Sequence, residues 1–198
     1  SINAGGAQWM TAGSGVIHSE MPLPGEGSMM HGFQFWLNLP ATEKMQAPAY
    51  RDIQGEEIKP FQQDDAQVRL IAGHMAQHDG DVTGKTTRAL LADVQLPAGG
   101  VANLVYAEGL TSQFYVYQGS VQVGDTPVKR GELASLGEGE GLRLAAAEQS
   151  GLLLFGGLPL NEPVAHYGPF VMNTQKEIDK AIADYQNGTL VTKPVTSL

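Results

Sequence analysis

The sequence contains no cysteine. This excludes disulfides, zinc sites built from thiolates and a cysteine nucleophile. Basic residues are scarce as well: 12 Lys and Arg stand against 21 Asp and Glu, and the formal net charge is −9. An acidic surface repels phosphate backbones, so direct nucleic-acid binding is not expected. No apolar run approaches the length of a membrane span, which argues against a membrane-inserted protein.

Histidine is also sparse, and its distribution is uneven. The five histidines are His18, His31, His74, His78 and His166. None lies between residues 79 and 165, so that stretch cannot build an imidazole-based site. The sequence also lacks a G-x-S-x-G elbow, a P-loop and a dinucleotide-binding glycine pattern. Hydrolysis by a catalytic triad and nucleotide-dependent chemistry therefore have no motif here.

Glycine, in contrast, is abundant, with 25 residues in a chain of 198. It divides the sequence into short segments, a pattern typical of strands joined by turns. A long connection is expected at 41–66 and a loop at 74–85. A tight reversal is expected at Gly124-Asp125. Strands are predicted at 7–10, 16–20, 31–39, 50–53, 68–73, 89–96, within 114–133, at 142–147 and at 151–157.

One helix is predicted, close to the C-terminal end, at about 174–187. Thr174 suits the N-cap and Glu177 follows three residues later, which is the pattern of a capping box. Ile178 and Ile182 recur at helical spacing, and Gly188 is the expected stop. We expect this helix to be a packing element.

The segment "GVIHSEMP" (15–22) places a histidine and a carboxylate two positions apart. On a strand, Val16, His18 and Glu20 would share one face, so the two polar groups could reach a common metal. The alternative is an ordinary strand whose polar residues face water. A tight site would need one or two further ligands. His31 is a candidate to orient a ligand by hydrogen bond, or else a plain polar strand end.

Three longer stretches together resemble the pirin family. They are "QWMTAGSGVIHSEMP" (8–22), "HGFQFWLNLPATEKMQAPAYRDI" (31–53) and "YGPFVMNTQKEIDKAIADYQNG" (167–188). The resemblance runs from about Ala7 to Gly188 and implies an all-β bicupin: two cupin-type β-barrels with a C-terminal α-helix. Residues 1–70 would be the remainder of an incomplete N-terminal barrel and 71–160 a C-terminal barrel without metal. Residues 161–198 would form the segment that carries the helix.

The resemblance also implies one metal ion, usually iron, held by three histidines and one glutamate. Carried over, His18 and Glu20 would be two of these ligands, and Glu20 would also be catalytic. Mn, Co, Ni, Cu or Zn would suit the same donors. The family's early H-x-H motif, which supplies the other two histidines, is absent from this sequence. "SINAGG" (1–6) resembles the tail of a strand, so we expect a fragment or one of two pieces, completed by an N-terminal segment or by another copy.

For the intact protein, the family implies an oxidoreductase of the quercetin 2,3-dioxygenase type, with a flavonol as substrate. The alternatives are a non-enzymatic, metal-bearing regulator that binds transcription factors or metabolic enzymes, and a metal-free fragment. A cytoplasmic location is expected, or a nuclear one in a eukaryote.

Overall fold

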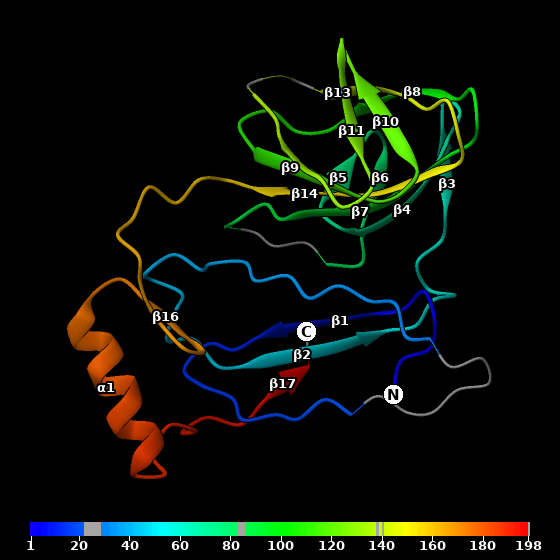
Figure 1. The fold of residues 1–198 in the computed structure, drawn as a ribbon. Coiled ribbons are helices and arrows are strands. Elements are labelled where there is room, and N and C mark those ends of the chain that lie inside the picture. The colour runs from blue at the N-terminus through cyan, green and yellow to red at the C-terminus, as the bar shows by residue number, and fades with distance from the viewer. Residues whose placement is uncertain (22–28, 83–85, 138, 140, 198) are drawn as a thin grey trace. The chain divides into compact units, whose positions relative to one another are not determined.

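A computed structural model of the chain describes residues 1–21, 29–82, 86–137, 139 and 141–197 (Figure 1). The described residues form many strands and one helix near the C-terminal end, which confirms the predicted all-β class with a C-terminal helix. Chain contacts divide the protein into two compact units. The first combines Ser1–Trp9 with Asp52–Leu160, and the second combines Met10–Arg51 with Asn161–Leu198. The division at residues 70 and 160 stays a prediction.

The first unit contains two larger sheets and a short hairpin. The six-stranded sheet has the order β12-β9-β14-β7-β4-β3, with β3 Phe61–Gln63, β4 Ala66–Ala72, β7 Leu90–Leu96, β9 Thr111–Gln118, β12 Leu133–Ser135 and β14 Ser150–Gly157. The four-stranded sheet has the order β11-β10-β13-β8, with β8 Val101–Val105, β10 Ser120–Val123, β11 Thr126–Lys129 and β13 Gly141–Ala145. The hairpin consists of β5 His74–Met75 and β6 His78–Asp79. Most of these strands overlap the segments that the sequence predicted. However, β3 lies in the stretch expected as a connection (41–66), and no strand was predicted at β8.

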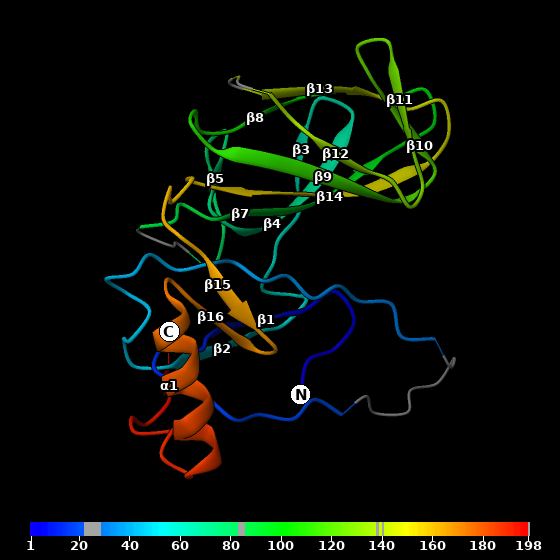
Figure 2. The same ribbon diagram turned by 60° about the vertical axis from the view of Figure 1, so that its left-hand side comes forward.

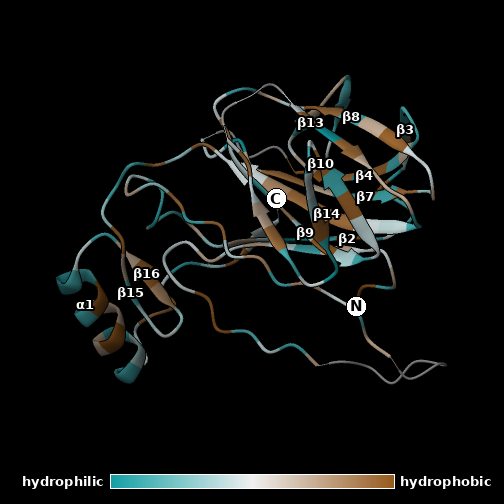
Figure 3. Cartoon of the chain, turned by 45° about the horizontal axis from the view of Figure 1, so that its top comes forward, coloured by the Kyte–Doolittle hydropathy of each residue, from teal (hydrophilic) through white to brown (hydrophobic). Residues whose placement is uncertain are grey.

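Both larger sheets contribute to one hydrophobic core. In β7, Leu90, Ala92, Val94 and Leu96 are all buried, as the alternation of the sequence predicts for a strand with one face on a core. Phe114 of β9 is the largest fully buried side chain of the chain. Brown, hydrophobic segments run through β9 and β14 in Figure 3. Burial of alternate residues therefore fixes the register of these strands.

Two connections in this unit show how turns are built. The reversal at Gly124-Asp125 is confirmed, because Val123 pairs with Thr126 and Gly124 has φ +54°. The segment expected as a loop at 74–85 instead contains the β5–β6 hairpin, and residues 83–85 lie outside the described part. The hairpin is regular because Met75 is buried and forms a β-bridge with Tyr106.

The remaining strands and the helix build a smaller sheet and a β-hairpin with a helix beside it. β1 Ala7–Thr11, β2 Ala49–Ile53 and β17 Thr196–Ser197 form a sheet in the order β1-β2-β17. β15 Ala165–Tyr167 and β16 Phe170–Met172 form a hairpin, and α1 Gln175–Gln186 runs beside it (Figure 2). No helix of the described chain is long and apolar enough to cross a membrane.

The start and stop of α1 confirm the sequence prediction. The Thr174 hydroxyl accepts a hydrogen bond from the Glu177 amide, and the Glu177 carboxylate accepts one from the Thr174 amide. This reciprocal box satisfies amides that have no partner inside the helix. Ile178 is fully buried, and Gly188 follows the helix with φ +70°. The helix is therefore anchored by its cap and by one apolar side chain.

Two predicted strands, at 16–20 and 31–39, were wrong. Neither segment belongs to a β-ladder within the described residues. In the second segment, Phe33, Phe35 and Leu37, which alternate as a buried face would, are all exposed. Extended backbone becomes a strand only when a neighbouring strand accepts and donates its hydrogen bonds. The described chain offers these two segments no such neighbour.

Candidate functional site

The segment that carries His18 and Glu20 follows a firmly anchored turn. The Ser14 amide donates to the Gln46 carbonyl at 2.9 Å. Gly13 has φ +52° and Gly15 has φ +129°, and a Cβ at Gly15 would lie 2.8 Å from Leu190 Cγ. Only glycine combines this backbone with so close an approach. The turn therefore fixes where the segment with the candidate ligands begins within the second unit.

His18 Nδ1 lies 3.9 Å from Glu20 Oε1, so the two side chains point toward a common region. They are 43% and 61% exposed, and water or an ion can reach both. The distance is longer than a hydrogen bond. An ion between the two atoms would receive one imidazole nitrogen and one carboxylate oxygen. This donor pair suits the divalent transition metals.

The described residues do not complete a metal site. Among them, no three side chains of His, Asp or Glu converge on one point. His31 is exposed and packs edge-on to Phe33, with 5.0 Å between ring centroids. The role of His31 toward a ligand stays a prediction. The pair formed by His18 and Glu20 thus fits part of a metal site, and a tight site needs further donors.

The other three histidines are exposed, and each has a specific contact. His74 Nδ1 lies 2.8 Å from Asp79 Oδ1 across the β5–β6 hairpin. The His78 ring stacks on Phe61. His166 Nε2 lies 2.8 Å from the Gly168 carbonyl oxygen. None of these contacts involves His18 or Glu20, so none of the three histidines extends the pair at 18 and 20.

Sequence reasoning missed the one buried cation of the second unit's described residues, Lys44. Its side chain is only 6% exposed, and its ammonium donates to Asn38 Oδ1 and to the Val171 carbonyl. Burial lowers the pKa of Lys44, while the carboxylates of Glu162 and Glu177 act in the opposite direction. Lys44 falls in the stretch predicted as a long connection, 41–66. No local pattern signals its burial, because one of its two partners, Val171, lies 127 residues away along the chain.

Two protein families match parts of the chain. The pirin C-terminal cupin domain matches residues 91–191, and the pirin domain matches residues 1–37. A solved structure titled quercetin 2,3-dioxygenase, from Acinetobacter baumannii, superposes with a TM-score of 0.82 at 33% identity, over 96% of this chain and 68% of that one. The likeness supports a cupin fold for the strands described above.

Relatives with known sequences give the same result. A Vibrio cholerae protein named as a candidate quercetin 2,3-dioxygenase is 44% identical over 94% of this chain and 68% of its own length. A pirin-like protein of Caulobacter vibrioides is 39% identical, with the same two coverages. Mouse pirin is 38% identical over 94% of this chain and 65% of its own length. The chain thus spans about two thirds of these relatives, and it belongs to the pirin family.

Proposed function

We propose that this chain is part of a metal-dependent flavonol dioxygenase of the quercetin 2,3-dioxygenase type. One observation carries the proposal: His18 and Glu20 present a nitrogen and an oxygen 3.9 Å apart, both open to solvent. The resemblance in fold and sequence to a structure titled quercetin 2,3-dioxygenase supports this reaction class. The flavonol as substrate rests on the names of that structure and of the Vibrio relative.

The proposed metal is iron, with Mn, Co, Ni, Cu or Zn as alternatives for the same donors. His18 would contribute an imidazole nitrogen and Glu20 a carboxylate oxygen. Because only two donors converge in the described residues, we propose that a further polypeptide supplies the rest. This partner would be an N-terminal pirin segment or a second copy of the chain. When bound, the metal would supply open positions for the flavonol oxygens and redox chemistry with dioxygen.

Glu20 has a second proposed task, which is to accept the proton of the flavonol hydroxyl. A general base must lie within hydrogen-bond reach of the proton that it removes. The Glu20 side chain is 61% exposed, so it is open to such an approach. His18, two residues away on the same extended segment, would fix the position of the carboxylate relative to the substrate. Glu20 would thus connect substrate binding to substrate ionisation.

The first test is the metal content of the protein as isolated, followed by a quercetin turnover assay. We expect no turnover from this chain alone, and turnover together with near-stoichiometric metal once the ligand-bearing partner is added. Turnover by the pure chain would contradict the need for a partner. Stoichiometric metal without turnover of any flavonol would instead support the metal-bearing regulator. A complex that holds no metal would overturn both proposals.

A further inference from the structure

A hollow of about 230 Å³ lies in the first unit, between the turn that precedes β3 and the β5–β6 hairpin. We call it the hairpin hollow. It is lined by Glu57, Ile58, Lys59, Phe61, Leu70, His78, Asp79 and Asp81. Ile58 and Leu70 are almost fully buried and provide an apolar surface. Pockets for drug-sized molecules typically measure about 300–1,000 Å³, so this hollow suits a smaller ligand.

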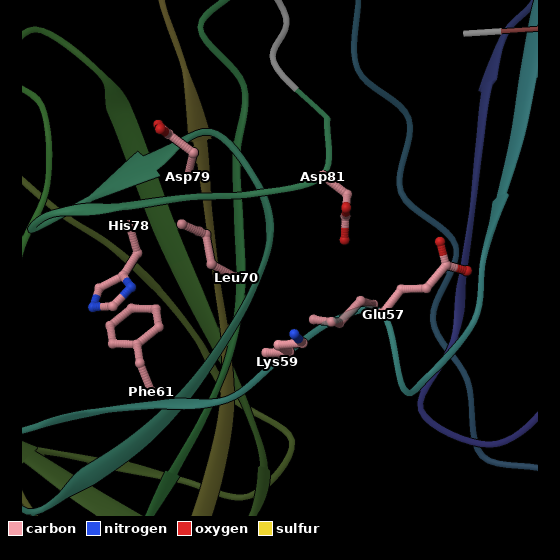
Figure 4. A pocket seen from close by; sticks show the side chains of 8 residues that line it. Glu57, Lys59, Phe61, Leu70, His78, Asp79 and Asp81 are labelled. Carbon is pink, nitrogen blue, oxygen red and sulfur yellow. The ribbon is translucent and has the colours of Figure 1, made fainter.

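One side of the hairpin hollow is a pair of stacked rings. The imidazole of His78 lies on the ring of Phe61, with 3.8 Å between centroids and 11° between planes (Figure 4). The two rings come from β6 and β3, so the contact ties the hairpin to the edge of the six-stranded sheet. Aromatic side chains attract flat groups and cations. This side therefore favours a ligand with a ring.

Acidic side chains line the hollow on more than one side. In Figure 4 the Asp81 side chain lies across Leu70 from the ring pair. The lining contains three carboxylates and one ammonium, so its formal charge is 1 − 3 = −2 with His78 neutral. A negative field concentrates cations. Three metal-ligating side chains do not converge anywhere in the described residues, so an organic cation fits this hollow better than a bare metal ion.

The backbone around the hollow is firmly held. The Gly80 amide donates to the Gly73 carbonyl at 2.8 Å, and a Cβ at Gly80 would lie 2.7 Å from the Ala72 amide nitrogen. The contact between His74 and Asp79 closes the same hairpin. Asp79 is thus held to β5 through His74, and on the other side of Asp81 the Val82 amide donates to the Ile71 carbonyl of β4 at 3.3 Å, so the two aspartates at 79 and 81 keep their places. A fixed wall lowers the entropy cost of binding.

We propose that the hairpin hollow binds a small organic cation that carries a flat ring. The ring would pack against Phe61, His78 and the apolar floor, and the ammonium would face Asp81. This inference goes beyond the proposed dioxygenase, because the hollow contains neither His18 nor Glu20. It can hold or fail independently of the metal chemistry.

The test is an NMR titration of the full chain with 2-phenylethylamine, which combines a phenyl ring with an ammonium. We expect the amide signals of residues 58–61 and 78–82 and the ring signals of His78 to shift, with a roughly millimolar Kd. Two matched compounds separate the contributions. Phenylethanol keeps the ring without the charge, and butylamine keeps the charge without the ring. Each should bind roughly fivefold more weakly, or not at all.

Two variants and one control locate the binding. Asp81→Asn and Phe61→Leu should each weaken 2-phenylethylamine binding roughly fivefold. Asp125→Asn, in the β10–β11 turn, changes the net charge equally and should leave Kd unchanged. The proposal is overturned if no signal near the hollow shifts, if butylamine binds as well as 2-phenylethylamine, or if Asp125→Asn weakens binding as much as Asp81→Asn. The spectra of the variants also report whether each one is folded.

Discussion

His18 Nδ1 lies 3.9 Å from Glu20 Oε1 on a segment that joins no β-ladder within the described residues. One residue separates them along the chain, and both side chains are exposed. The pair is therefore available to a ligand and contributes little to the core. Core packing is therefore not the role of these two side chains, and this leads directly to the first prediction.

Replacing His18 or Glu20 with alanine should remove the metal from the complete, metal-loaded protein and leave its stability nearly unchanged. Each side chain would be a ligand, whereas exposed positions usually contribute less than about 0.5 kcal/mol to the free energy of unfolding. Elemental analysis and urea unfolding measure the two quantities. His74→Ala, in the other unit, is the matched control and should retain the metal. Unfolding of either site variant would show that the pair is structural.

The second prediction separates the buried core from the exposed apolar segment. Phe114→Ala should lower the free energy of unfolding by about 3–5 kcal/mol, because the side chain is fully buried between strands. Trp36→Ala should cost less than about 1 kcal/mol, because Trp36 is 62% exposed. Urea unfolding of both variants at one pH measures the difference. Equal losses would mean that Trp36 is covered in solution, by another chain or another copy.

The core strands and the helix could be predicted because their signals are local. Alternation at Leu90 and Val94 places one face on a core, and Thr174 with Glu177 marks a helix start within four residues. The segment at 31–39 shows equally clear alternation, yet it forms no strand in the described chain. A strand also needs a neighbour, and alternation within a segment says nothing about that neighbour. The same limit explains both wrong strands.

The candidate site divides in the same way. The spacing of His18 and Glu20 predicts that the two groups can face one point. Their nearest polar atoms lie 3.9 Å apart, although the segment is not the strand on which this prediction rested. Whether further metal-ligating side chains converge there depends on residues that are far from 18 and 20 along the sequence. Lys44 was missed for this reason, since its hydrogen bonds reach Asn38 nearby but also Val171 far along the chain. Long-range partners of polar groups leave no periodic signal.

Lys44→Met should lower the free energy of unfolding by about 1–3 kcal/mol. The change keeps much of the apolar stem but leaves Asn38 Oδ1 and the Val171 carbonyl without their donor. It also removes the positive charge near Glu162 and Glu177. Lys129→Met, an exposed position on β11, alters the net charge equally and serves as the control. An equal, small effect of both changes would show that the buried ammonium contributes nothing specific.

The last prediction concerns a half-buried tyrosine on β9. The Tyr117 hydroxyl donates to Asp93 Oδ1 at 2.5 Å, and the side-chain amide of Gln95 donates to the Tyr117 hydroxyl oxygen. Burial raises the pKa of Tyr117 well above its usual value, and the hydrogen bond to Asp93 and the charge of Asp93 act in the same direction. The folded protein thus keeps Tyr117 neutral at a pH where the unfolded chain ionises it.

The sign of the resulting pH dependence follows from proton counts. Above about pH 10 the unfolded state releases the Tyr117 proton and the folded state keeps it, so stability falls as pH rises. Tyr117→Phe should lower stability by about 0.5–1.5 kcal/mol at pH 8, since it loses the hydrogen bond. The variant has no tyrosine at this position to ionise, so its free energy of unfolding does not fall for this reason at high pH. The difference in free energy of unfolding between the wild type and the variant should therefore shrink between pH 8 and pH 11. Urea unfolding at both pH values, with Tyr185→Phe as the exposed control, tests this. A deficit that stays constant would show that Tyr117 ionises equally in both states, and that Asp93 does not hold its proton.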